Sequence, residues 1–277
     1  MHHSRASHTA KLTTLARAAL SFQTGPVNDP HAQSFLPARW LPLIPMLRAG
    51  LWSWPVVRDL LGNVGGRTCF FDEQLQRAID RGIEQVAILG AGYDSRAIRF
   101  ADQPVGFFEV DHAATHAAKS DRLQTLGLSS PAVHVAVDFE KDDVAQRLQR
   151  AGFEPHRATF FLWEGVIEYL EEQTARATLR SLREIAAPEG CLAFDFQTGT
   201  PPQRSPLRAR LGKVGFSLLN ESVRLRLGHE PMRQLLLDEG WRLETIIGIA
   251  QLYERYLAGV LNRPPENDRC VALAAPC

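Results

Sequence analysis

Strand-like and helix-like segments alternate along most of this chain, and the alternation limits the folds that it can adopt. Short apolar runs are separated by longer segments whose apolar residues recur every three or four positions. Strands are expected at 85–89, 105–110, 133–137, 158–163 and 191–196, and helices at 70–82, 112–126, 142–151 and 171–187. Apolar strands that alternate with amphipathic helices are typical of a parallel sheet covered on both faces. We therefore predict a three-layer α/β fold.

The two ends of the chain depart from this pattern. Residues 1–66 hold short helix-like runs interrupted by prolines, which end helices early, so we expect a helical cap or lid there. The domain with the sheet is then expected to span 67–277, with an insertion near 200–228 in a stretch that begins rich in proline and arginine. A last helix and two strands are expected at 230–239, 241–248 and 270–274.

Charge and cysteine usage exclude several functional classes. The 31 basic residues balance 31 acidic ones, so no bulk charge attracts the protein to nucleic acid or to an anionic membrane. No apolar run is long enough to span a bilayer, and the N-terminus lacks the apolar core of a secretory signal. The four cysteines are scattered, without metal-ligand spacing. We expect a cytoplasmic protein that binds neither nucleic acid nor membrane.

Histidines do not predict a metal site either. His112 and His116 lie four residues apart on one expected helix, a spacing that can bind metal, but no third ligand is evident in the sequence. His134 alternates within an expected strand and is assigned to packing. We therefore predict that the protein holds no metal ion.

A glycine-rich turn follows the first strand of the predicted sheet. The strand at 85–89 ends in Gly90-Ala91-Gly92, and a polar Tyr93-Asp94-Ser95-Arg96 comes next. Ligands of an open parallel sheet bind at the carboxyl ends of its strands, and glycine lets the backbone come close to them. A tight turn without a ligand is the alternative for the glycine pair alone. A dinucleotide fingerprint is disfavoured, because Ser95 stands at its third glycine position.

Acidic residues stand at the ends of the next three strands. Asp111 ends the second strand, where it suits a ribose diol or caps the helix that follows. Asp138 and Glu164 stand at the matching positions of the third and fourth strands. A NAD enzyme needs no acid at Asp138, whereas an adenine amine benefits from one. These strand ends together predict a nucleoside cofactor other than NAD.

These motifs resemble the S-adenosylmethionine-dependent methyltransferases of the leucine carboxyl methyltransferase family, whose bacterial branches O-methylate small natural products. The most specific match is the Gly-Ala-Gly-x-Asp-Ser/Thr-Arg turn at 90–96. The other matches cover nearly the whole chain: Thr9-Ala10, Arg17-Ala18, Asp29-Pro30, Arg67-Thr68 with Asp72, Glu109-Val110-Asp111, Asp138-Phe139, Glu164-Gly165 with Tyr169-Leu170, and Gly240-Trp241. The chain departs at Glu168, where the family usually has an apolar residue. We expect Glu168 to be a solvated residue at a helix start or, alternatively, a local specificity feature.

The resemblance implies a Rossmann-like class I methyltransferase sheet under an N-terminal helical cap, with S-adenosylmethionine as cofactor and S-adenosylhomocysteine as its product. The cofactor-binding residues that it implies are Arg67, Gly90, Ala91, Gly92, Asp111, Asp138, Phe139 and Glu164. Asp111 would hold the ribose, and Asp138 with Phe139 the adenine. Gly90 and Glu164 would hold the methionine portion, whose carboxylate a guanidinium such as that of Arg67 pairs with well.

The acceptor is expected to be a small molecule with a carboxylate or a hydroxyl group. A carboxylic acid with a pKa of about 4 is already ionised at neutral pH, whereas a hydroxyl needs a base. No histidine–acid pair stands at a motif position, which favours a carboxylate. The resemblance suggests Arg17 and Tyr169 as acceptor-positioning residues; a solvated helix residue and a core aromatic are the respective alternatives.

The sequence thus predicts an S-adenosylmethionine-dependent O-methyltransferase of secondary metabolism. A protein C-terminal carboxyl methyltransferase, as in the eukaryotic relatives, is the first alternative. It ranks lower because the balanced charge and the short insertion offer little docking surface. A non-catalytic protein that binds S-adenosylmethionine is the alternative from another class.

Overall fold

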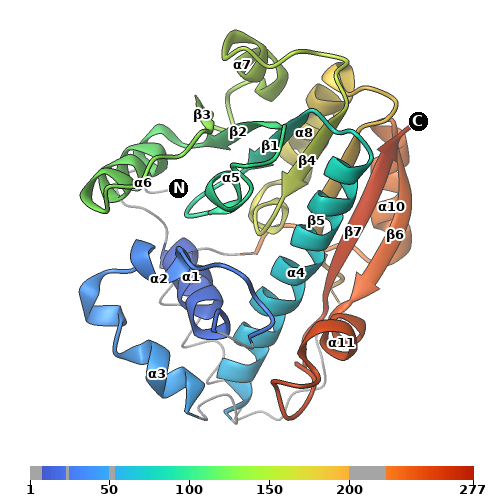
Figure 1. The fold of residues 1–277 in the computed structure, drawn as a ribbon. Helices are drawn as coiled ribbons and strands as arrows, with labels where there is room; N and C mark the ends of the chain where they lie inside the picture. The colour runs from blue at the N-terminus through green and yellow to red at the C-terminus, as the bar shows by residue number, and fades with distance from the viewer. Residues whose placement is uncertain (1–7, 23–24, 50–53, 200–222) are drawn as a thin grey trace.

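A single sheet forms the centre of the molecule. The computed structural model describes residues 8–22, 25–49, 54–199 and 223–277 (Figure 1). In this part of the chain the seven-stranded sheet has the order β3-β2-β1-β4-β5-β7-β6. The strands are β1 (Gln85–Leu89), β2 (Gly106–Asp111), β3 (Val133–Ala136), β4 (Thr159–Trp163), β5 (Cys191–Gln197), β6 (Trp241–Gly248) and β7 (Arg269–Pro276). All seven agree closely with the strands expected from the sequence.

The last strand along the chain runs against its neighbours. Strands β1 to β5 pair in parallel, as expected, whereas β7 lies antiparallel between β5 and β6. The sequence predicted a strand here but not its direction. The chain leaves β6 through the short α11 (Ile249–Leu252) and η4 (Tyr253–Leu257), which pack on α4 (Pro55–Asp80). Because this connection stays at the carboxyl edge, the next strand has to run back along the sheet.

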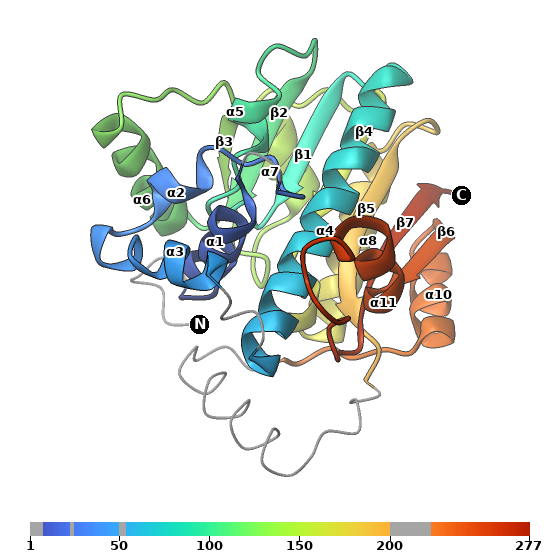
Figure 2. The ribbon, with the colours of Figure 1, turned by 60° about the horizontal axis from the view of Figure 1, so that its bottom comes forward.

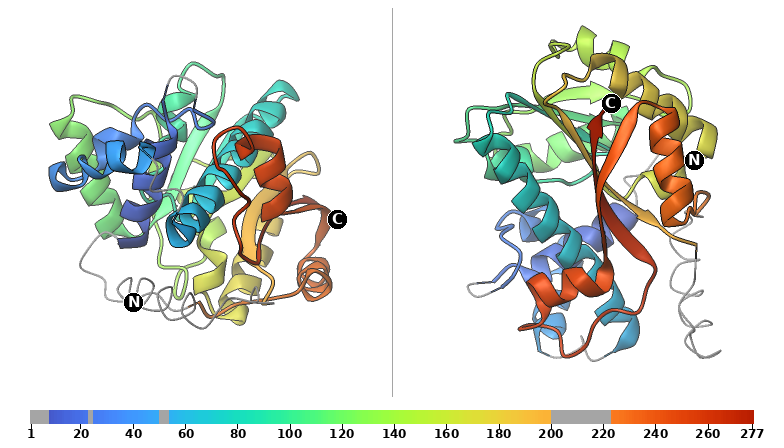
Figure 3. Two further views of the ribbon diagram at one scale, coloured as in Figure 1. Left: turned by 90° about the horizontal axis from the view of Figure 1, so that it is seen from below. Right: turned by 90° about the vertical axis from the view of Figure 1, so that its right-hand side faces the viewer.

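Helices cover both faces of the sheet (Figures 2 and 3). Helices α4, α5 (Arg96–Arg99) and α11 pack on one face, and α7 (Val144–Arg150), α8 (Glu172–Ile185) and α10 (His229–Asp238) pack on the other, while α6 (Ala113–Thr125) lies beside β3. Successive side chains of a strand point to opposite faces. In β4, Leu162 therefore joins the core under α4, and Phe161 and Trp163 join the core under α8. Two covered faces explain why these strands are apolar throughout.

Helix α4 is longer than the sequence suggested. The expected helix at 70–82 and the last helix-like run of residues 1–66 form one helix of 26 residues, Pro55–Asp80. Glycines inside a helix cost about 1 kcal/mol each relative to alanine. Here they permit close packing: a Cβ on Gly62 would lie 2.1 Å from Pro265 Cγ, and one on Gly65 would lie 2.6 Å from Leu20 Cδ1. The predicted boundary between cap and sheet domain falls within this helix, and the division into 1–66 and 67–277 stays a prediction.

The N-terminal region is helical, as expected. Its elements are α1 (His8–Leu20), α2 (Ala32–Phe35), η1 (Ala38–Trp40) and α3 (Leu43–Arg48). Helix α1 packs on α4 through a buried cluster that includes Leu20, Leu61 and Val64. The predicted insertion near 200–228 falls mainly on residues 200–222, which lie outside the described residues. Among the described helices, none has the length and apolar character needed to cross a membrane.

Removing the Phe161 ring should destabilise the fold. Phe161 is fully buried, and its ring centroid lies 6.1 Å from those of Phe153 and Trp241. Phe161→Ala is expected to lower the free energy of unfolding by about 3–5 kcal/mol, because a cavity remains in the core. Urea denaturation measures this, with the exposed Leu237→Ala as control, for which a change within about 0.5 kcal/mol is expected. Equal effects of the two substitutions would contradict this packing.

Candidate active site

The glycine turn after β1 is held against the end of β2. Gly90 and Gly92 have φ angles of +70° and +49°, in the region that favours glycine. A Cβ on Gly90 would lie 2.2 Å from Val166 Cγ2, so the turn contacts the segment that follows β4. The amides of Gly90 and Ala91 donate to Val110 O at 2.7 and 3.1 Å. The structure thus brings the predicted residues of this turn to the carboxyl edge of the sheet.

Asp111 joins the turn to the start of α6. Its Oδ2 accepts a hydrogen bond from the Gly92 amide, and its Oδ1 accepts one from the His112 amide, both at 2.6 Å. The N-cap of α6 is His112, whose Nδ1 accepts from the Ala114 amide at 3.4 Å, so the capping role that the sequence left open for Asp111 is wrong. Each carboxylate oxygen of Asp111 has a further lone pair, so its two hydrogen bonds do not conflict with a role in ribose binding.

Asp138 and Phe139 lie after β3 and shape their own turn. Asp138 accepts hydrogen bonds from the Glu140 amide at 3.1 Å and from Lys141 Nζ at 2.8 Å. The Phe139 ring stacks at 6.4 Å on Trp163, the last residue of β4. Trp163 is fully buried, and its indole nitrogen has no hydrogen-bond partner among the described residues. Trp163 was not predicted from the sequence, because it is one apolar residue among others in its strand.

Glu164 forms ion pairs with two buried arginines. Arg67, from the middle of α4, approaches Glu164 Oε1 through Nε at 2.9 Å, and Arg96, from α5, donates to Oε2 at 2.9 Å. Arg67 also donates from Nη1 to Asp195 Oδ2 at 2.7 Å. Asp195 further accepts from the Gly165 amide at 2.5 Å. The sequence analysis missed Asp195, although an acid inside an apolar strand was a usable signal.

The Asp-Ser-Arg part of the turn motif forms a framework of ion pairs. Arg96 is almost fully buried and bonds Asp94, Glu164 and, from Nε at 2.7 Å, Asp72 of α4. Arg99 donates to Asp72 Oδ2 at 2.6 Å. Burial by itself raises the pKa of Asp94, but Arg96 and its cationic neighbours outweigh this and lower the pKa to about 2. These residues therefore fix the turn in place.

Glu168 is buried, so the expectation of a solvated residue is wrong. Only 2% of its side chain is exposed; Oε1 accepts from Arg269 Nη2 at 2.7 Å, and Oε2 accepts from Gln197 Nε2 at 2.6 Å. Its cationic partner comes from β7, the last strand along the chain. The local sequence does not reveal this long-range contact. Tyr169, beside it in η3 (Ile167–Tyr169), is half-buried.

Arg17 is also buried, which excludes the alternative of a solvated helix residue. It donates from Nη2 to Tyr93 O at 2.5 Å, and its Nε lies 2.9 Å from Asp29 Oδ2. Helix α1 thus rests on the glycine turn, and Ala10 Cβ lies 3.6 Å from the place of a Cβ on Gly92. The contacts give Arg17 an anchoring role; its role toward an acceptor stays a prediction.

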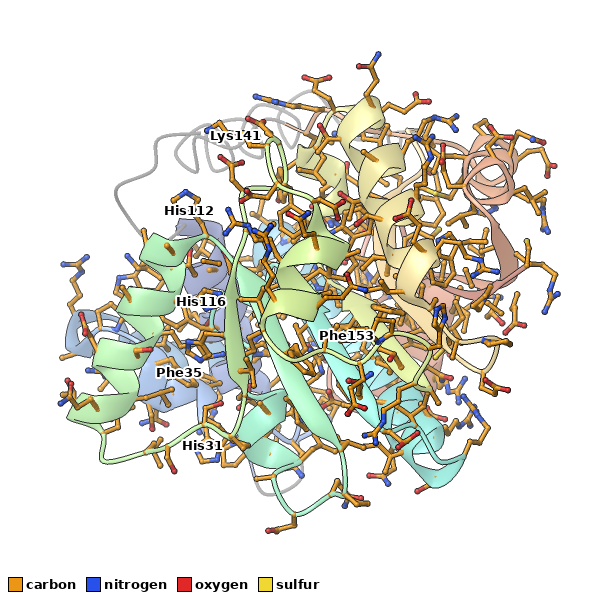
Figure 4. All side chains as sticks on the ribbon, turned by 90° about the horizontal axis from the view of Figure 1, so that it is seen from above. His31, Phe35, His112, His116, Lys141 and Phe153 are labelled. Carbon is orange, nitrogen blue, oxygen red and sulfur yellow. The ribbon has the colours of Figure 1, made fainter. Side chains whose placement is uncertain are left out.

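One group of possible metal ligands lies behind the turn. Among the described residues, Glu109, His116 and His134 offer ligand atoms within 4.8 Å of one another (Figure 4 labels His116 on α6). Of the His112–His116 pair that the sequence offered, this group contains only His116. However, Glu109 accepts from Lys119 Nζ at 2.7 Å, and His116 Nε2 bonds Val135 O at 3.1 Å. A cation would have to displace the Lys119 ammonium group. The metal-free state stays a prediction.

The charges at this edge suit a cationic ligand. Five carboxylates (Asp72, Asp94, Glu164, Glu168 and Asp195) interlock with four guanidinium groups (Arg67, Arg96, Arg99 and Arg269), which leaves one net negative charge. S-adenosylmethionine carries one net positive charge because its sulfonium adds to a zwitterion. The open backbone of the turn and this charge fit that cofactor. The contact of each predicted residue with it stays a prediction.

Acid should weaken the framework through Asp94. A pKa lowered from 3.8 to about 2 contributes stability that is present above pH 4 and is lost as the pH falls toward 2. At pH 7 we expect the free energy of unfolding of Asp94→Asn to be about 2 kcal/mol lower than that of the wild type. This difference should shrink below pH 4. Urea titrations at several pH values test it, with the exposed Asp121→Asn as control. A difference that is constant down to pH 3 would contradict the assignment.

The chain is similar in sequence and in fold to known proteins. The model of the leucine carboxyl methyltransferase family matches residues 10–183. S-adenosyl-L-methionine-dependent methyltransferases, so named, of Mycobacterium bovis (strain BCG / Pasteur 1173P2) and Mycobacterium tuberculosis (strain ATCC 25177 / H37Ra) are each 31% identical over 276 residues, 94% of this chain and 87% of theirs. The magnesium protoporphyrin IX methyltransferase of Synechocystis PCC 6803, solved with bound SAH, has a TM-score of 0.50 at 14% identity, with coverage of 80% of this chain and 87% of that chain.

These matches agree with the motifs and the sheet. The family model spans more than half of the chain, and the mycobacterial relatives align over almost all of it. The solved structure supports the Rossmann-like class I fold, and its low identity limits that comparison to the fold. The chain therefore belongs to the leucine carboxyl methyltransferase family and is an S-adenosylmethionine-dependent methyltransferase.

Proposed function

We propose that the enzyme transfers the methyl group of S-adenosylmethionine to a carboxylate oxygen of a small-molecule acceptor. The observation that supports this most is the state of the acids at the carboxyl edge. Glu164 and Asp195 each contact two arginines, and Glu168 accepts from Arg269 and Gln197. Acids held in this way are poorly placed to take a proton from a hydroxyl. A carboxylate acceptor needs no base, since it is already ionised.

The chain's own residues would bind and orient the reactants. When bound, S-adenosylmethionine supplies an electrophilic methyl group, whose bond to sulfur breaks as the new bond to the acceptor oxygen forms. The glycine turn and Asp111 would hold the nucleoside, and Arg67 would hold the amino-acid portion through its carboxylate. Helix α1, which rests on the turn through Arg17, would cover the site and exclude water. Alignment of the reactants then supplies most of the rate enhancement.

Asp111 should contribute to donor affinity. Asp111→Asn removes the charge that a ribose diol would share, and hydrogen bonds to charged groups contribute about 1.5–3 kcal/mol. We expect binding of S-adenosylhomocysteine to weaken by about 10- to 100-fold in isothermal titration calorimetry. The matched control is Asp102→Asn, an exposed residue in the turn before β2 and so at the opposite edge of the sheet. Full-strength binding by Asp111→Asn would refute the ribose assignment.

The pH dependence and the product identify the acceptor group. With donor labelled in its methyl group, small carboxylic acids should give a base-labile methyl ester at a rate that is nearly constant from about pH 6 to 9, because their pKa is about 4. Phenols and a peptide with a free C-terminal leucine complete the panel. A base-stable ether formed at a rate that rises with pH would identify a hydroxyl acceptor. Labelling of the peptide alone would support protein methylation, and binding without any transfer would support a non-catalytic role.

A further inference from the structure

We propose that Arg269 binds the carboxylate of the acceptor, with Tyr169 beside it as a hydrogen-bond donor. The inference rests on the proposed function and names the group that recognises the substrate. Arg269 was not singled out from the sequence, since it lies in the last strand and far along the chain from every motif. Its place in the fold, its ion pairs and its neighbours carry the argument.

The direction of β7 brings Arg269 to the ligand-binding edge. Arg269 is the first residue of β7 and pairs in register with Gln197, the last residue of β5. Because β7 is antiparallel to β5, its start meets the carboxyl end of β5. In a fully parallel sheet the first residue of the strand would lie at the opposite edge. The antiparallel strand therefore adds a guanidinium to the edge where ligands of such sheets bind.

Two buried acids fix the Arg269 guanidinium. Nη2 donates to Glu168 Oε1 at 2.7 Å, and Nη1 donates to Asp195 Oδ2 at 3.3 Å, while both acids are only 2% exposed. Within the described part of the chain, these bonds use two of the five N–H donors of an arginine. The Arg269 side chain keeps 12% exposure. A guanidinium that two acids hold in place is well suited to bind a further carboxylate through its remaining donors.

Asp195 places this guanidinium next to the predicted donor site. Its Oδ2 accepts from Arg67 Nη1 at 2.7 Å and from Arg269 Nη1 at 3.3 Å. One carboxylate thus lies between two arginines, each of which has a further carboxylate partner, Glu164 for Arg67 and Glu168 for Arg269. If Arg67 holds the amino-acid portion of the donor, Arg269 lies on the other side of Asp195, close to the reaction centre. In-line transfer requires the acceptor to lie beside the donor.

Tyr169 adds a second polar group. It follows Glu168 directly in η3, and Glu168 itself accepts from Arg269 Nη2 at 2.7 Å. A phenol can donate a hydrogen bond to a carboxylate oxygen that a guanidinium already holds. The unusual Glu168 then has a purpose: it positions Arg269, whereas an apolar residue at that place would leave the guanidinium without its nearest anion.

The test compares acids with their amides. A panel of straight-chain and aromatic monocarboxylic acids identifies the best acid substrate of the wild type. Calorimetry on the complex with S-adenosylhomocysteine then measures binding of that acid and of its primary amide. We expect the wild type to prefer the acid and Arg269→Gln to lose this preference by about tenfold or more, with KM raised more than kcat. A general loss of structure would weaken acid and amide alike.

Controls separate this inference from the proposed function. Because Arg269 shares Asp195 with Arg67, binding of S-adenosylhomocysteine is measured in Arg269→Gln as well and should fall by less than binding of the acid. Arg242→Gln, an exposed arginine of β6 paired with Ala275 at the opposite edge, should keep the acid preference. Arg269→Lys and Tyr169→Phe provide milder changes if Arg269→Gln folds poorly, and each should weaken the preference in part. If the enzyme still prefers the acid over its amide after all three substitutions, the role of Arg269 is overturned while the proposed function stands. Methylation of hydroxyls and of no acid overturns the proposed function as well.

Discussion

The arrangement of the site depends on the contact of Glu164 with two buried arginines. Glu164 directly follows β4, while Arg67 comes from the long helix before β1 and Arg96 is the first residue of α5, after the turn that follows β1. A buried carboxylate that lost one partner would leave an uncompensated charge, which costs several kcal/mol. The three elements are therefore coupled, and the turn, the strand end and the helix form one rigid edge. A ligand at this edge meets polar groups that are already in place.

A second set of contacts holds the turn from its other sides. Lys119 of α6 donates to Asp94 O at 2.6 Å from behind, and Arg17 of α1 donates to Tyr93 O from the cap. Two cations thus bond successive carbonyls of the same turn. Movement of α1 would change the contacts of the turn directly, which links coverage of the site to the geometry of the cofactor-binding backbone.

Local patterns predicted the elements well and their long-range partners poorly. The strand 85–89 and the turn that follows it were expected from apolar residues and glycines, and the structure has both. By contrast, Glu168 was expected to be solvated, because it stands at an expected helix start. Its partner Arg269 lies 101 residues away and reaches it only because β7 inserts beside β5. Trp163 was missed because it is one apolar residue among others in its strand, whereas Asp195 stands out there as an acid, although its partner Arg67 lies far away in the sequence.

The sequence by itself determined the α/β fold, the family and the cofactor, because apolar periodicity and a contiguous glycine motif are local features that survive without knowledge of contacts. Tertiary structure alone decided the antiparallel β7, the burial of Arg17 and Glu168, and the ion network that joins Arg67 to Arg269 through Asp195. Whether a charged side chain is solvated or paired depends on segments that are distant in sequence. Only the folded chain brings those segments together and fixes the charge of the site.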